Sequence, residues 1–191
     1  MNCAQCNDKN CYLGEKVCHN LQEECLQKYE NPADRNAVTI SSELEANYYC
    51  QLTRFEEVYK YCEMMGYQKI GLAFCFGLSE EAKLISDYFG QKFKVASVCC
   101  KNGSISKETF SVPKVKEGRY EAVCNPVGQA MILNKEKTDL NLIIGLCVGH
   151  DILFTQHSEA PVSTLVVKDR VLAHNPLGAL YSGYYRKKLI R

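Results

Sequence analysis

A chain of 191 residues, with 46% apolar and 24% charged side chains, can bury one sizeable core, and its composition excludes an intrinsically disordered protein. Lys and Arg number 23 and Asp and Glu number 22, so no basic excess predicts a nucleic-acid surface. No apolar run approaches the ~18 residues of a membrane helix, and no signal-type segment opens the chain. We therefore expect a cytoplasmic protein with no nucleic-acid and no membrane partner.

Four of the twelve cysteines fall at the start of the chain, at Cys3, Cys6, Cys11 and Cys18. Segment 1–18 is too short to bury four thiols in a core of its own, and a reducing cytoplasm disfavours disulfides, so the group indicates metal binding. Four thiolates suit tetrahedral zinc or an iron–sulfur cluster. Zinc modules usually pair two CxxC knuckles, and only one is present here. We therefore favour a cluster and keep zinc as the alternative.

Residues 19–66 are predicted to be helical. A first helix covers HNLQEECLQKY, and the chain breaks at Asn31–Pro32. A second helix is predicted to begin near Ser42, because Ser42–Glu45 has the spacing of a capping box and apolar residues then recur every three or four positions up to Gly66. The cysteines of this zone are predicted to be packing residues, namely Cys25, Cys50 and Cys62.

Residues 67–191 alternate short apolar runs with helix signals, which predicts an α/β, Rossmann-like domain whose mostly parallel sheet carries helices on both faces. Strands are expected in KIGLAFC, FKVASVCC, EAVC and LNLIIGLC, and VSTLVVKDRVLA follows them. Helices are expected in SEEAKLISDYFG and PVGQAMILNKEK, and a polar loop over 101–119 is too long for a plain connection. The small Cys-rich segment 1–18 and the helical segment 19–66 precede this domain, and the helical segment is expected to pack on its core.

A second group of cysteines marks the ends of the predicted strands, at Cys75, Cys99, Cys100, Cys124 and Cys147. Open α/β sheets bind ligands outside the carboxyl ends of their strands, so these thiols are predicted to converge on one crevice. Neighbouring residues on a strand point to opposite faces, and we place Cys100 rather than Cys99 at the site. Helix N-termini follow several of these thiols and favour thiolate, the form that binds metal. Cys75, Cys100, Cys124 and Cys147 are therefore predicted to hold a second metal or cluster.

Three further polar residues lie close to this predicted edge, namely His150, Asp151 and His174. The GHD stretch can orient a ligand, donate a proton or accept a metal, and the HNP at His174 repeats the CNP that begins at Cys124. No Walker loop, GxGxxG fingerprint, GxSxG elbow or HExxH helix is present. No catalytic residue is predicted, and the sequence leaves open both a reaction and the oligomeric state.

The stretches AFCFGL, SVCCKNG, CNPVGQA, GLCVGHD and KDRVLAHNPLGALYSGYY, with the CxxC-containing opening, resemble a known group of proteins. The chain is similar to the cysteine-rich, proposed metal-binding family classified as domain of unknown function 1847. The likeness covers almost the whole chain. It implies metal binding at both cysteine groups and supplies no substrate.

The leading hypothesis is an iron–sulfur protein with one centre at the N-terminal cysteines and a second in the crevice, serving electron transfer or a reduction with a redox partner protein. The alternative is a zinc-binding module with a crevice that binds a metal or small ligand without turnover. A third hypothesis is thiol–disulfide chemistry at Cys99 and Cys100 or at Cys3 and Cys6. It is disfavoured because vicinal cysteines form only a strained ring and no CxxC opens a helix after a strand.

Overall fold

The computed structural model describes residues 1–190, which form two compact units divided between Tyr49 and Cys50. The first unit contains two short 3-10 turns and two helices: η1 (Cys3–Gln5), η2 (Asn10–Leu13), α1 (Gln22–Lys28) and α2 (Pro32–Tyr48). Within residues 1–190, no helix is both long enough and apolar enough to cross a membrane.

Helix α2 begins at Pro32 and not near Ser42, so that sequence prediction was wrong. Asn31 caps the helix, since its side chain accepts the Ala33 N–H at 2.9 Å and proline occupies the first helical position. Ser42 lies inside the helix, where its hydroxyl donates to the Val38 carbonyl one turn back. The stronger start signal at Asn31 overrides the weaker one downstream.

The predicted long helix is also interrupted, because the chain leaves helical geometry after Tyr48 and restarts as α3 (Arg54–Met64). Thr53 and Glu56 form a complete capping box at this restart. The T-x-x-E spacing here is thus a true cap, whereas the similar spacing at Ser42 is not. Gly66, with φ of 73°, follows the end of α3 as predicted.

The second unit is built on a four-stranded, wholly parallel sheet with the order β2-β1-β3-β4. Its strands are β1 (Lys69–Phe74), β2 (Lys94–Cys99), β3 (Leu140–Ile144) and β4 (Val162–Val166). Its other helical elements are η3 (Phe76–Leu78), α4 (Ser79–Gly90), η4 (Asn102–Ser104), η5 (Lys107–Phe110), α5 (Pro126–Lys135), α6 (His150–His157), α7 (Gly178–Tyr181) and α8 (Gly183–Leu189).

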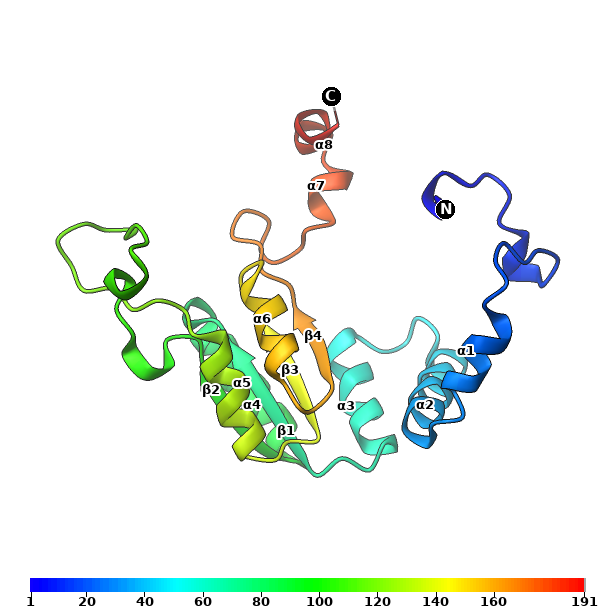
Figure 1. The fold of residues 1–191 in the computed structure, drawn as a ribbon, viewed down its shortest axis with the longest axis horizontal. Coiled ribbons are helices and arrows are strands. Elements are labelled where there is room, and N and C mark those ends of the chain that lie inside the picture. The colour runs from blue at the N-terminus through cyan, green and yellow to red at the C-terminus, as the bar shows by residue number, and fades with distance from the viewer. Residues whose placement is uncertain (191) are drawn as a thin grey trace. The chain divides into compact units, whose positions relative to one another are not determined.

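Helices cover both faces of this sheet (Figure 1). On one face, side chains of α3 and α4 pack against Ile70, Leu72 and Leu142. On the other face, α5 and α6 pack against Ala73 and Ile143. The alternation follows from the two-residue period of a strand. The predicted Rossmann-like α/β fold is confirmed.

One predicted strand is absent from the sheet. The EAVC stretch makes only an isolated antiparallel bridge, between Ala122 and Ser106 of the long loop. The loop pairs with itself here: the Lys107 N–H donates to the Glu121 carbonyl and the Val123 N–H to the Ile105 carbonyl. Cys124 therefore reaches the sheet edge from a loop and not from the end of a strand.

Gly71 of β1 lies opposite Asn141 of β3, and the two approach closely. A Cβ atom at Gly71 would lie 1.9 Å from Asn141 Oδ1. The Asn141 amide is fully buried and fixed by two hydroxyls, accepting from Thr138 at 2.7 Å and donating to Ser158 at 2.8 Å. Only glycine leaves room for this buried amide.

Replacing Gly71 by alanine is expected to lower the free energy of unfolding by about 2–4 kcal/mol, because the added methyl must displace a hydrogen-bonded buried amide. Urea denaturation measures the change. Gly90→Ala is the matched control, since nothing lies within 4 Å of a Cβ at the end of α4, and its effect is expected to stay within about 1 kcal/mol. Equal stability of the two variants would show that Asn141 moves freely.

Candidate thiol site at the carboxyl ends of the strands

Cys75 and Cys100 directly follow two neighbouring strands. The β1–β2 ladder ends with Phe74 opposite Cys99, so the next residue of each strand also faces its counterpart. The Cys100 N–H donates to the Phe74 carbonyl at 2.9 Å and extends the ladder by one step. Both thiols lie on the α5 face of the sheet, next to Val98 and Ala73. The parallel register thus places the two thiols side by side.

Cys124 joins them through a network of asparagines. The Asn125 N–H donates to the Cys100 carbonyl at 2.7 Å. The Asn102 side chain donates to the carbonyls of Cys99 and Asn125, at 3.0 and 2.9 Å. Asn125 also caps α5, with Pro126 at the first helical position as predicted from the sequence. The strand end, the loop and the helix start are therefore tied together around Cys124.

The pKa values of Cys75, Cys100 and Cys124 depend on one another through side-chain hydrogen bonding, with Cys100 between the other two. Cys100 is 3% exposed, and its sulfur accepts the Phe76 N–H at 3.3 Å. Cys99, one residue earlier, packs against the same apolar cluster but has none of these thiol contacts among those described for residues 1–190. The structure thus brings Cys75, Cys100 and Cys124 together.

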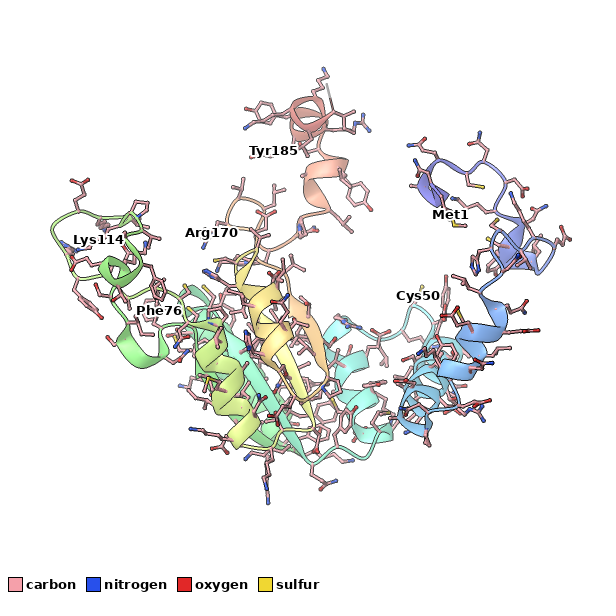
Figure 2. The ribbon with its side chains drawn as sticks, viewed as in Figure 1. Met1, Cys50, Phe76, Lys114, Arg170 and Tyr185 are labelled. Carbon is pink, nitrogen blue, oxygen red and sulfur yellow. The ribbon has the colours of Figure 1, made fainter. Side chains whose placement is uncertain are left out.

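Cys147 lies in the turn between β3 and α6. Its carbonyl accepts the His150 N–H at 2.9 Å at the start of α6. Its thiol accepts a hydrogen bond from the Arg170 guanidinium at 3.0 Å, and this guanidinium also interacts with the charges of Cys75 and Cys124. Figure 2 shows Phe76 and Arg170 near this same end of the sheet. Arg170 therefore links Cys147 electrostatically to the other thiols.

Three cations surround the thiols, and sequence reasoning missed all of them. The Lys168 ammonium donates to the Cys75 sulfur at 3.2 Å. Lys101 is hydrogen-bonded to Cys124 and to the Ala122 carbonyl, the latter at 2.6 Å. With Arg170 they make the site electropositive. Two features of the sequence could have indicated these cations. Lys101 directly follows Cys100, and Lys168 and Arg170 belong to the KDR stretch just after a predicted strand.

Gln129 of α5 fixes the strand ends beneath the thiols. It is fully buried, and its Nε2 donates to the carbonyls of Val98 and Phe74, at 2.7 and 3.2 Å. These carbonyls lie one residue before the ends of β2 and at the end of β1, close to Cys100 and Cys75. Among the described buried side chains, Gln129 Oε1 lacks a hydrogen-bond partner. Gln129 acts as a clamp that holds the two strand ends, and hence their thiols, in register.

Hydrogen bonding and charge separate the pKa values of the three contacting thiols. The hydrogen bond from Cys100, the Gly77 amide and Lys168 lower the pKa of Cys75 to about 4. The hydrogen bond from Cys100, with Lys101 and His150, lowers the pKa of Cys124 to about 5. The same two hydrogen bonds and burial raise the pKa of Cys100. These surroundings thus favour the thiolate form of Cys75 and Cys124 and the protonated form of Cys100.

Alkylation of Cys75 by iodoacetamide is expected to proceed at pH 6 at a rate close to its rate at pH 8, because a lowered pKa keeps the thiolate populated across this range. Lys168→Met should move the pH midpoint upward. Cys62 is the control, since burial raises its pKa to about 12 and it should stay unlabelled. Peptide mapping by mass spectrometry gives both rates. A roughly tenfold fall in Cys75 labelling per pH unit below 8 would contradict the thiolate assignment.

The N-terminal cysteines lie in the first unit, and none of them is buried. The Cys6 thiol donates to the Asp8 carbonyl at 2.6 Å, and Lys16 lies 3.9 Å from the Cys6 sulfur and interacts with the charge of Cys18. The η1 and η2 turns carry Cys3 and Cys11. Within residues 1–190, no three His, Cys, Asp or Glu side chains are arranged as a ligand set for a metal ion.

The remaining cysteines behave differently from one another. Cys62 is fully buried on α3, as predicted for a packing residue. Cys25 and Cys50 are exposed, so the packing prediction was wrong for them. Cys25 lies on α1, which has no buried residue, and Cys50 has a φ of 57° in the turn after α2. All twelve cysteines are free thiols.

His174, a crevice candidate from the sequence, lines a different cavity. This pocket of about 630 Å³ is mostly apolar and is bounded by α3, α4, the end of β4 and the loop after it, with Phe55, Leu84 and Tyr88 in its wall. His174 Nδ1 accepts the Asp169 N–H at 3.2 Å, which holds the loop in place. No contact of His174 with the crevice thiols is among those described for residues 1–190.

Comparison with known proteins places the chain in a family. Residues 13–165 match the model of the family described as protein of unknown function DUF1847. An uncharacterized protein of Methanocaldococcus jannaschii is 47% identical over 190 residues, which cover 100% of this chain and 98% of the relative. No solved structure matches the chain. The matched range includes all four crevice thiols, and the chain belongs to the DUF1847 family.

Proposed function

We propose that the crevice binds an iron–sulfur cluster or a related thiophilic metal centre through Cys75, Cys100, Cys124 and Cys147, and that this centre serves redox chemistry. The observation that carries the proposal is the convergence of thiols from separate segments at one sheet edge, with Cys100 hydrogen-bonded to two of them. Thiolates are the ligands that soft metals and iron–sulfur clusters prefer.

The charges of the site support a thiolate-bound centre. Four thiolates in one crevice repel one another, and Lys101, Lys168 and Arg170 offset part of that repulsion. Backbone amides of Phe76 and Gly77 also donate to Cys100 and Cys75. Hydrogen bonds to ligand sulfurs tune the reduction potential of a cluster. A bound cluster would supply one-electron transfer at this edge of the sheet.

One observation favours zinc as a second candidate. A single tetrahedral ion with zinc–sulfur bonds of about 2.3 Å holds its sulfurs about 3.8 Å apart, which is close to the separation of hydrogen-bonded thiols. Cys75 and Cys124 both interact with Cys100 through side-chain hydrogen bonding, so the three thiols lie near one another. Loading would replace this hydrogen bonding by metal–sulfur bonds and would require the side chains to move, because no three such groups form a ligand set in residues 1–190. Zinc would serve structure or ligand binding without electron transfer.

The N-terminal group is proposed to bind a centre of its own. Cys3, Cys6, Cys11 and Cys18 are accessible, and the short turns that carry them contribute no buried residue. A metal would supply the cohesion that this segment does not obtain from a core. Two redox centres in one chain would require a redox partner protein. The twelve free thiols support a reducing, cytoplasmic compartment, and the balanced charge argues against a nucleic-acid partner.

The test is the metal and acid-labile sulfide content of the full chain purified without oxygen, with its visible spectrum. Brown protein that contains iron and sulfide and bleaches on reduction supports clusters, and the amount per chain separates one centre from two. Colourless protein with about one zinc per chain supports the zinc module. Protein free of both iron and zinc overturns the metal proposal.

A further inference from the structure

Cys75 and Cys100 occupy aligned positions at the ends of two neighbouring strands. They are the residues that follow the aligned pair Phe74 and Cys99, and the Cys100 N–H bond to the Phe74 carbonyl keeps the two strands together at this point. Neighbouring strands lie about 4.8 Å apart, which falls within the Cα separation that a disulfide requires. Both side chains pack against the same apolar cluster, and the Cys100 sulfur accepts the N–H of Phe76, the residue after Cys75, at 3.3 Å. The strand register therefore places the two thiols next to each other.

Other pairings of these thiols are less favourable. Cys99 and Cys100 are neighbours in the chain, and vicinal cysteines form only a strained ring. The Cys147 sulfur instead accepts a hydrogen bond from the Arg170 guanidinium. Cys124 contacts Cys100 but is carried by a loop, so no strand register fixes its distance. From the sequence, thiol–disulfide chemistry at Cys99 and Cys100 or at Cys3 and Cys6 was a disfavoured hypothesis, whereas the sheet register aligns Cys75 with Cys100.

We propose that Cys75 and Cys100 form a reversible dithiol–disulfide couple that exchanges with low-molecular-weight disulfides. Cys75 is the attacking group, because the Lys168 ammonium lies 3.2 Å from its sulfur and the Gly77 amide donates to it, whereas Cys100 is buried behind it. Cys100 is the resolving thiol.

The exchange balances in two steps. The Cys75 thiolate attacks one sulfur of the disulfide, a bond forms between Cys75 and that sulfur, and the other half leaves as a thiolate. Cys100 then loses its proton to solvent and attacks the Cys75 sulfur, which closes the protein disulfide and releases the second thiolate. Two protein thiols are oxidised and one disulfide is reduced to two thiols. A small thiol reductant reverses both steps.

This couple does not depend on the metal centre proposed above, although both use the same sulfurs. A protein disulfide removes two ligands, so oxidation and metal loading exclude each other. The experiment therefore starts from the full chain, reduced and freed of metal by a chelator without oxygen. The metal content of the same preparation is measured before chelation, so the two proposals fail independently.

The chain is equilibrated with mixtures of reduced and oxidised glutathione, quenched in acid, labelled at free thiols, digested with trypsin and analysed by mass spectrometry. Cleavage separates the two thiols into peptides 70–83 and 95–101. These two peptides are expected to appear joined by one disulfide, increasingly so as the oxidised fraction rises. Free or separately glutathionylated peptides at every ratio would overturn the proposal.

Three cysteine-to-serine variants show which residues form the disulfide. Peptide 95–101 carries both Cys99 and Cys100, so Cys99→Ser is the matched control and should retain the link. Cys100→Ser should lose the link and accumulate glutathione on Cys75, by about tenfold over the unmodified chain, because the resolving thiol is gone. The Cys75→Ser variant should form neither the disulfide-linked peptides nor the glutathione adduct at position 75. Retention of the link in Cys100→Ser, or its loss in Cys99→Ser, contradicts the pairing. Circular dichroism confirms that each variant is folded.

Discussion

Replacing Cys124 by serine is expected to remove the crevice metal and leave the N-terminal centre loaded, so that the metal content per chain falls by about half. A serine hydroxyl is a poor ligand for soft metals, and Cys124 also belongs to the hydrogen-bonded chain through Cys100. Metal and sulfide analysis of anaerobically purified protein measures the loss. The visible spectrum should lose intensity in the same proportion.

Two matched variants sharpen this expectation. Cys99→Ser changes a half-buried thiol one residue from the site, and it should keep the full metal content. Cys11→Ser should remove the other centre and make residues 1–18 more susceptible to proteolysis, because metal binding and local folding are coupled in so short a segment. Equal metal loss in Cys99→Ser and Cys124→Ser would mean that thiol count and not crevice geometry decides binding.

Phe89→Ala is expected to lower the free energy of unfolding by about 3–5 kcal/mol. Phe89 of α4 is fully buried, and its ring contacts Tyr59, Tyr88 and Phe93 at centroid distances of 5.7, 5.5 and 6.2 Å. Removing the ring leaves a cavity and removes one aromatic contact between α3 and α4, while the contact of Tyr59 with Tyr88 at 4.9 Å remains. Chemical denaturation followed by circular dichroism gives the change.

Phe110→Ala is the control for that measurement. Phe110 lies in η5, is 59% exposed, and should change the free energy of unfolding by no more than about 0.5 kcal/mol. If Phe89→Ala costs less than about 1 kcal/mol, the aromatic cluster does not hold α3 and α4 on the sheet. In that case the stability of this face must come from the aliphatic side chains of the strands.

The candidate site was predicted in part. The strand ends at Cys75 and Cys100 follow from short apolar runs bounded by turn and helix signals. The start of α5 follows from Asn125, because a capping side chain before proline is a local signal. The preference for Cys100 over Cys99 agrees with its contacts to the other thiols. Such features depend on neighbours in the sequence, and local patterns suffice to predict them.

Other features needed the folded chain. The ammonium of Lys168 lies 93 residues from Cys75 in the sequence, and no local pattern relates them. The EAVC stretch looks like a strand because its residues suit one, yet pairing within the loop decides otherwise. The residues from Ser42 to Glu45 have the spacing of a capping box, yet the helix already begins at Pro32, where Asn31 caps it. In each case a tertiary or competing contact overrode a short-range preference.

The sequence by itself determined the class of fold and the presence of thiols at one sheet edge, because periodicity and residue type dictate which segments become buried strands and where they end. The tertiary structure decided which thiols touch, which of them are charged and which cations face them. Those properties depend on strand register and on the path of the loop after β4, and both are set by contacts between residues far apart in the chain.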